Sequence, residues 1–261
     1  MSKFKIRDNY LPPLDATHNI SVLNTTRSAA AKAWFDIAYE NIISAEILLN
    51  SKRFPHTVFF IQQTIECLIK GIFSENGIVE PQKASDINHY AFEAFHTYYV
   101  EFHDQYGMEF SDLAKQIIDK GDTFSEKLEF CASIANILTT DYNKNIDIRD
   151  KQINAEYNPK ALGLKEDASQ IECHKRIYRL YYFQYILHLL SYIFSHEAES
   201  CARYPKISNT NSVLMPSTIF DNKISKNLSQ LVILLKHITS EIINDSLNLM
   251  FWRCGTAAAL S

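Results

Sequence analysis

The chain has 261 residues, of which 46% are hydrophobic and 21% charged, and its formal net charge is −4 with a pI near 6.1. This balance predicts a globular protein with a sizeable core. It excludes a chain that is basic throughout, but it leaves a local basic patch open. The 6 glycines and 7 prolines are too few for the turns of a sheet-rich fold. We therefore predict an all-α fold.

The cysteine spacing and the apolar runs of the sequence indicate the cellular compartment of the protein. The five cysteines form no CxxC pair, which favours free thiols in a reducing cytoplasm over a disulfide framework or a zinc site. The amino-terminal segment lacks the apolar core of a signal peptide. The longest apolar run carries Arg179, Gln184 and His188, which is typical of a buried helix rather than a membrane span. We expect a cytoplasmic protein with no membrane contact, no metal and no other cofactor.

The sequence of the amino-terminal third predicts an irregular arm that is followed by two helices. Residues 1–27 hold Pro12-Pro13 and no sustained periodicity, so we expect an irregular arm. Ser28 is suited to cap a first helix, which Arg53-Phe54-Pro55 then interrupts, and Pro55 is suited to begin the second. The apolar residues of the first helix recur at helical spacing: Trp34, Ile37, Ala38, Ala45, Leu48 and Leu49.

The second predicted helix reads PHTVFFIQQTIECLIKGIFSENG and ends at Gly77. Gln63, Glu66 and Lys70 lie three and four residues apart, so they form a polar stripe on one side. The simplest interpretation is a surface pair that stabilises the helix by about 0.2–0.5 kcal/mol. Cys67 is expected to pack rather than to act as a nucleophile. The apolar face holds Phe59, Ile65, Leu68, Ile69 and Ile72.

The rest of the chain predicts further helices in one antiparallel bundle. We expect helices near 89–107, 110–120, 122–140, 169–201 and 225–250, a polar segment at 141–167 and a loop at 206–220. The last helix carries Leu228, Leu231, Val232, Leu235, Ile238, Ile242 and Leu249 at helical spacing. The expected organisation is an arm at 1–27, a bundle at 28–205, and a carboxy-terminal helix at 221–251 packed on the same domain.

The helix pair at 30–77 resembles the start of a HEPN-superfamily domain. Members of that superfamily have an Ala-rich first helix ending in a Leu-Leu pair, a short break, and a second helix of the form F-x-x-QQ-x-x-E-x-x-x-K. The resemblance extends to about residue 95. It is carried here by Leu48-Leu49, Arg53-Phe54-Pro55, Phe59, Gln62, Gln63, Glu66, Lys70 and Asn88-His89.

This resemblance implies a helical bundle that acts on RNA. Many HEPN proteins are metal-independent ribonucleases of toxin–antitoxin modules, phage defence and RNA-guided immunity. Their Arg-x(4–6)-His site is completed across a homodimer. The guanidinium holds the scissile phosphate, the imidazole exchanges a proton, and the RNA 2′-hydroxyl attacks. The implied partners are a second copy of the chain, RNA or a nucleotide, and an antitoxin or defence protein.

The closest match to this motif is Arg149-Asp150, followed by Asn154 where a histidine is expected. No arginine of the chain has a histidine five to seven positions downstream. Asparagine hydrogen-bonds, but it cannot exchange a proton near neutral pH. Three interpretations stay open. The site binds RNA or a nucleotide without cutting, or it is an active site whose histidine has been replaced in this sequence, or Arg149 is a surface residue of a polar segment.

A second candidate is the basic cluster at the start of the 169–201 helix, formed by His174, Lys175, Arg176 and Arg179. It is either a set of solvated side chains or a phosphate-binding patch with Tyr178, Tyr181 and Tyr182 available for base stacking. His89, His96 and His103 recur every seven residues, which puts neighbours ~10.5 Å apart on a helix and predicts no shared metal.

These observations leave three hypotheses for the role of the protein. The leading hypothesis is an RNA-directed defence or toxin-type protein with an altered ribonuclease site formed by Arg149, Asp150 and Asn154. If active, it is a metal-independent endoribonuclease. The alternative from another class is a non-catalytic helical scaffold or sensor that binds a nucleotide or a partner protein. The third is a structural bundle in which the Arg149 segment has no role.

Overall fold

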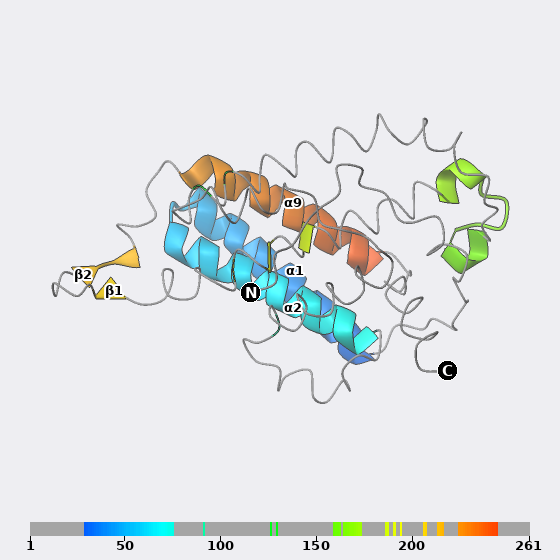
Figure 1. Ribbon diagram of the computed structural model, residues 1–261, viewed down its shortest axis with the longest axis horizontal. Helices are drawn as coiled ribbons and strands as arrows, with labels where there is room; N and C mark the ends of the chain where they lie inside the picture. Colours follow the sequence, from blue (N-terminus) through cyan, green and yellow to red (C-terminus); the bar gives the residue numbers. More distant parts are fainter. Residues whose placement is uncertain are drawn as a thin grey trace, which may run out of the picture.

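The computed structural model describes residues 29–75, 91, 126, 129, 159–162, 164–173, 186–187, 190–191, 194, 206–207, 213–216 and 224–244 (Figure 1). Three long helices dominate these ranges: α1 (Ala29–Asn50), α2 (Phe54–Glu75) and α9 (Ser225–Asn244). The short elements are the 3₁₀ helix η4 (Pro159–Leu162) and the strands β1 (Lys206–Ile207) and β2 (Val213–Leu214). The fold is all-α and forms an antiparallel helical bundle, as predicted, with one pair of two-residue strands beside the helices.

A tight turn makes α1 and α2 antiparallel neighbours (Figure 1). The amide of Arg53 donates to the carbonyl of Leu48, and the amide of Lys52 donates to the carbonyl of Leu49. Lys52 has a φ of 57°, the left-handed conformation that ends a helix in a Schellman motif. The carbonyl of Arg53 then accepts bonds from the amide and the hydroxyl of Thr57, which starts α2. A break between the two helices is therefore confirmed, but it lies at 51–53, because Phe54 and Pro55 already belong to α2.

The contact between α1 and α2 depends on a glycine. A Cβ atom at Gly71 would lie 2.7 Å from Cδ1 and 2.9 Å from Cζ of Phe35, closer than carbon atoms approach. Phe35 is fully buried against this bare stretch of backbone. Glycine lowers helix propensity by about 1 kcal/mol relative to alanine, so its presence in mid-helix marks a close approach.

The buried face of α1 differs in part from the prediction. Ala38 and Ala45 are fully buried as expected, but Ile37 is 43% exposed. Apolar residues occur on more than one side of this helix, so spacing alone did not select the side that packs. The residues buried on α1 are Ala31, Phe35, Ala38, Ile42 and Ala45.

Helix α9 packs against α1 and α2 although it follows them by more than 140 residues (Figure 1). Six of its seven predicted apolar residues are at most 3% exposed, and Leu249 lies outside the described residues. At the rim, the Lys236 ammonium donates to the Glu46 carboxylate at 2.7 Å. This hydrogen bond raises the pKa of Lys236 above its ordinary value. The domain boundaries at 27, 205 and 221 stay predictions.

The segment at 206–220 was predicted as a loop, and this prediction is wrong in part. Lys206 pairs with Leu214 and Ile207 with Val213 in an antiparallel register. Figure 1 shows this pair of strands beyond the ends of the helices. Four paired residues bracketed by polar sequence give too weak an alternation to identify from sequence. In the part of the chain that the structure describes, no helix is long and apolar enough to cross a membrane.

Replacing Gly71 with alanine is expected to lower the free energy of unfolding by about 1–3 kcal/mol, because the new methyl group overpacks against Phe35. Urea denaturation measures the change. Phe35→Leu in the same chain removes the obstructing ring carbons, so the double variant is expected to show strong favourable coupling. A Gly71→Ala variant that gains stability, as helix propensity alone predicts, would contradict the close approach.

Replacing Lys52 with glycine is expected to raise the free energy of unfolding by about 0.5–1 kcal/mol, because glycine adopts the left-handed conformation without strain from a Cβ atom. Lys52→Ala is the matched control. It also removes the charged side chain but keeps the Cβ atom, so it should bring no such gain. Equal urea midpoints for the two variants would rule out strain at this residue.

Candidate functional site

Helix α2 carries an unusual set of polar side chains inside the bundle. Every residue from Thr64 to Ser74 is buried, so the helix is covered on all sides. Gln62 is 1% exposed, and Glu66, Lys70 and Ser74 are each 5% exposed. These four residues follow one another at intervals of four, which aligns them along one side of the helix. We call Gln62, Glu66 and Lys70, together with the half-buried Gln63 beside Glu66, the buried polar stripe.

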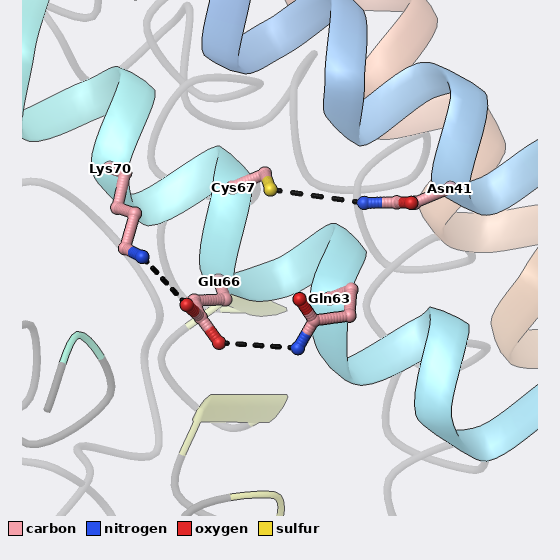
Figure 2. Close-up of polar contacts among 5 residues, drawn as sticks. All are labelled: Asn41, Gln63, Glu66, Cys67 and Lys70. Atoms are coloured by element: carbon pink, nitrogen blue, oxygen red, sulfur yellow. Dashed lines mark hydrogen bonds and ion pairs between the residues drawn. The ribbon is translucent and has the colours of Figure 1, made fainter. Parts of the chain in front are cut away.

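An ion pair lies at the centre of this stripe (Figure 2). The Lys70 ammonium is 2.7 Å from Oε1 of Glu66, and Nε2 of Gln63 donates to Oε2 of Glu66 at 3.4 Å. The same ammonium lies 5.0 Å from the ring centroid of Trp34 on α1. The Glu66 carboxylate and the Trp34 ring therefore both contact the buried positive charge, and a cation–π contact strengthens when water is excluded.

The prediction that Glu66 and Lys70 form a surface pair is wrong. Both side chains are only 7% exposed. Lys32 and Asp36 on α1 have the same spacing and the same 2.7 Å separation, yet their side chains are 67% and 44% exposed. The spacing along the helix is identical in the two cases, so spacing does not show which pair is buried.

One end of the stripe holds an unsatisfied acceptor. Oε1 of Gln62 is buried and has no hydrogen-bond partner among the described residues. The Ser74 hydroxyl, one turn beyond Lys70, is also buried and has no hydrogen-bond partner among the described residues. A buried acceptor without a donor costs about 1–3 kcal/mol, so such atoms are uncommon in cores. The sequence prediction placed Gln63 in the stripe and missed Gln62, although the QQ pair was a visible signal.

Cys67 lies on the side of α2 that faces α1, away from the ion pair (Figure 2). Its sulfur accepts a 3.8 Å hydrogen bond from Nδ2 of Asn41. Burial, reinforced by the nearby Glu66 charge, raises the pKa of the Cys67 thiol to about 12. A thiol that stays protonated at neutral pH is a poor nucleophile. Cys67 is buried, in agreement with the prediction that it packs in the core.

The residues predicted from the nuclease-type motif lie outside the described residues. This holds for Arg149, Asp150 and Asn154, and for the basic cluster His174, Lys175, Arg176 and Arg179. Their roles stay predictions. His89, His96 and His103 also fall outside, and the described residues contain no group of three His, Cys, Asp or Glu side chains that could hold a metal.

The helix that leads into the basic cluster begins where the sequence predicted. Residues 170–173 are helical, and the Ser169 hydroxyl accepts the amide of Glu172 at 3.3 Å. In return the Ser169 amide donates to the Glu172 carboxylate at 2.7 Å. This reciprocal pair is a capping box, which sets the first residue of a helix firmly. The first basic residue of the cluster follows one position after Cys173.

Removing one partner of the buried ion pair is expected to lower the free energy of unfolding by about 3–5 kcal/mol, because the other charge stays buried without compensation. Glu66→Gln and Lys70→Met test this in urea denaturation. Asp36→Asn is the matched control at the exposed pair, with an expected change of about 0.5 kcal/mol or less. Equal losses at the two pairs would show that burial does not govern the effect.

Comparison with known proteins places these features in a family. A sequence model of the HEPN domain matches residues 31–182, more than half of the chain. No curated protein and no solved structure matches the chain. The matched range holds all but the first two residues of α1, all of α2 and the whole buried polar stripe. The all-α antiparallel bundle agrees with this assignment, and the chain belongs to the HEPN domain family.

Proposed function

We propose that the chain is an RNA-directed defence or toxin-type protein whose ribonuclease site has been altered. Arg149 holds an RNA phosphate through its guanidinium, and Asp150 orients that guanidinium. Asn154 occupies the position of the base and donates a hydrogen bond without exchanging a proton. His174, Lys175, Arg176 and Arg179 add phosphate contacts along the RNA backbone.

One observation carries this proposal. The HEPN match extends from residue 31 to residue 182, so it includes both the Arg149 motif and the basic cluster. The resemblance in α1 and α2 alone would leave both segments outside the family's range. A match that includes them supports reading Arg149-Asp150-x3-Asn154 as this chain's version of the family's Arg-x(4–6)-His motif.

A second candidate function is a non-catalytic scaffold or sensor that binds a nucleotide or a partner protein. It is favoured by the absence of a histidine five to seven residues after any arginine. Without a group that titrates near neutral pH, the usual general acid–base chemistry cannot operate. The two functions differ in whether RNA binding depends on Arg149.

The proposed working form is a homodimer in the cytoplasm, in which two Arg149 segments face one another. An antitoxin or defence protein is the proposed further partner. RNA binding should be metal-independent, because the Arg149 guanidinium supplies the positive charge that holds the phosphate. Chelator in the assay buffer therefore leaves the proposed activity unchanged.

RNA binding and cleavage by the full-length chain, with chelator present, test the proposal. Arg149→Ala is expected to weaken single-stranded RNA binding by about tenfold or more, since a charge-assisted hydrogen bond to phosphate contributes about 1.5–3 kcal/mol. It should also lower the salt dependence of log K by about 0.7 for each phosphate that the protein no longer neutralises. Asn154→His is expected to introduce metal-independent cleavage, which Arg149→Ala in the same chain should abolish.

The matched control is Arg53→Ala, which removes an exposed arginine at the α1–α2 turn. It should leave RNA binding and its salt dependence unchanged. RNA binding that Arg149→Ala does not weaken, together with no cleavage by Asn154→His, would reject the site. Nucleotide or protein binding that is insensitive to Arg149 would favour the scaffold or sensor instead.

A further inference from the structure

The strand pair formed by β1 and β2 presents apolar side chains to solvent. Ile207 on β1 and Val213 on β2 are directly paired, so their side chains lie on the same face of the pair. The two residues are 68% and 56% exposed. Single exposed apolar residues are common on protein surfaces, but a directly paired isoleucine and valine form a small continuous apolar surface.

The backbone of the strand pair also has free edges. β1 and β2 form a sheet of two strands, and no third strand pairs with either of them among the described residues. Figure 1 shows the two strands beyond the ends of α1, α2 and α9. A sheet of two strands is marginally stable by itself in water, whereas a third strand and a covered apolar face make it stable. The pair therefore offers both the backbone groups and the apolar side chains that an added strand uses.

The size of this surface selects the kind of partner. A stable interface between two folded proteins buries about 800 Å² on each side, from about 20–30 residues. The strand pair consists of two residues from each strand, so it is too small to hold two folded copies of the chain together by itself. An extended segment needs less area, because hydrogen bonds along its backbone supply much of the affinity.

The sequence around the strand pair indicates the chemistry of that segment. Residues 200–220 contain Arg203 and Lys206 but no aspartate or glutamate, although the whole chain has a net charge of −4. An acidic segment is therefore attracted to this part of the chain. Pro205 precedes β1 and Pro216 follows β2 after one residue. Proline cannot donate a hydrogen bond to a neighbouring strand, so the added strand must be short.

We propose that the strand pair binds a short extended segment of a partner protein, which joins it as a third strand. The segment carries an acidic residue, and its apolar side chains occur at alternate positions, because successive residues of a strand point to opposite faces. Ile207 and Val213 contact these apolar side chains. This binding goes beyond the proposed RNA-directed function and does not depend on it, since the Arg149 segment has no part in it.

Selection of short peptides from a displayed random library, with the full-length chain as the target, tests this proposal. The enriched peptides are expected to alternate valine, isoleucine or threonine with other residues and to contain aspartate or glutamate. A labelled synthetic copy of an enriched peptide then gives a dissociation constant by fluorescence anisotropy. Two further copies are methylated on alternate backbone nitrogens, one for each edge of the peptide. One of them is expected to bind at least about tenfold more weakly, because it loses its hydrogen bonds but keeps its side chains.

Ile207→Thr combined with Val213→Thr removes the apolar surface but keeps β-branched side chains, which favour strands. The affinity for the enriched peptide is expected to fall by about tenfold or more, because the apolar contacts are lost. The melting temperature should stay the same, since both residues are exposed in the parent. Ile233→Thr on α9 is the matched control. Ile233 is 65% exposed and lies outside the strand pair, so its replacement should leave the affinity unchanged.

Other occupants of the strand pair would give different results. The proposal is overturned if no peptide is enriched, if neither methylated copy binds more weakly, or if the double variant binds the peptide as tightly as the parent. A parent dimer that the double variant dissociates in sedimentation equilibrium would identify a second copy as the occupant and overturn it as well. RNA binding that is lost in the double variant would place RNA on the strand pair, with the same consequence. RNA binding that is insensitive to Arg149→Ala affects the proposed RNA function alone.

Discussion

The buried ion pair between Glu66 and Lys70 constrains everything packed around α2. Two opposite charges 2.7 Å apart can be withdrawn from water only if each keeps polar partners, and Gln63 and the ring of Trp34 provide them. The side of α2 that carries the ion pair must then be covered by other segments, as is the side that faces α1. Continuous burial from Thr64 to Ser74 shows that it is. In the part of the chain that the structure describes, α2 is thus a core helix with an ion pair on one side.

Where helices begin and end could be predicted from the sequence, because the residues at each helix end determine it. The break before α2 comes from Pro55 and from the left-handed turn at Lys52, and the start of the helix at 170 comes from the Ser169 cap. Burial did not follow in the same way. Glu66–Lys70 and Lys32–Asp36 have the same spacing, and only their surroundings make one pair a core element and the other a surface pair.

The HEPN family match includes α2, the helix that carries the ion pair. The residues that carry the HEPN resemblance in α2 are, for the most part, the members of the buried polar stripe rather than its exposed neighbours. Gln62, Glu66 and Lys70 are each at most 5% exposed, so this part of the family's pattern lies in the core. In the proposed function, contact with RNA comes from the Arg149 segment and the basic cluster.

The most direct measurement is ultraviolet cross-linking of single-stranded RNA to the full-length protein in chelator, with the cross-linked peptides identified by mass spectrometry. It needs no substitution, so stability effects do not enter. We expect cross-links in peptides that contain residues 149–154 and 174–182, where arginines and tyrosines are proposed to contact phosphates and bases. Cross-links confined to the exposed sides of α1 and α9, or no cross-links at all, would contradict the proposed RNA site.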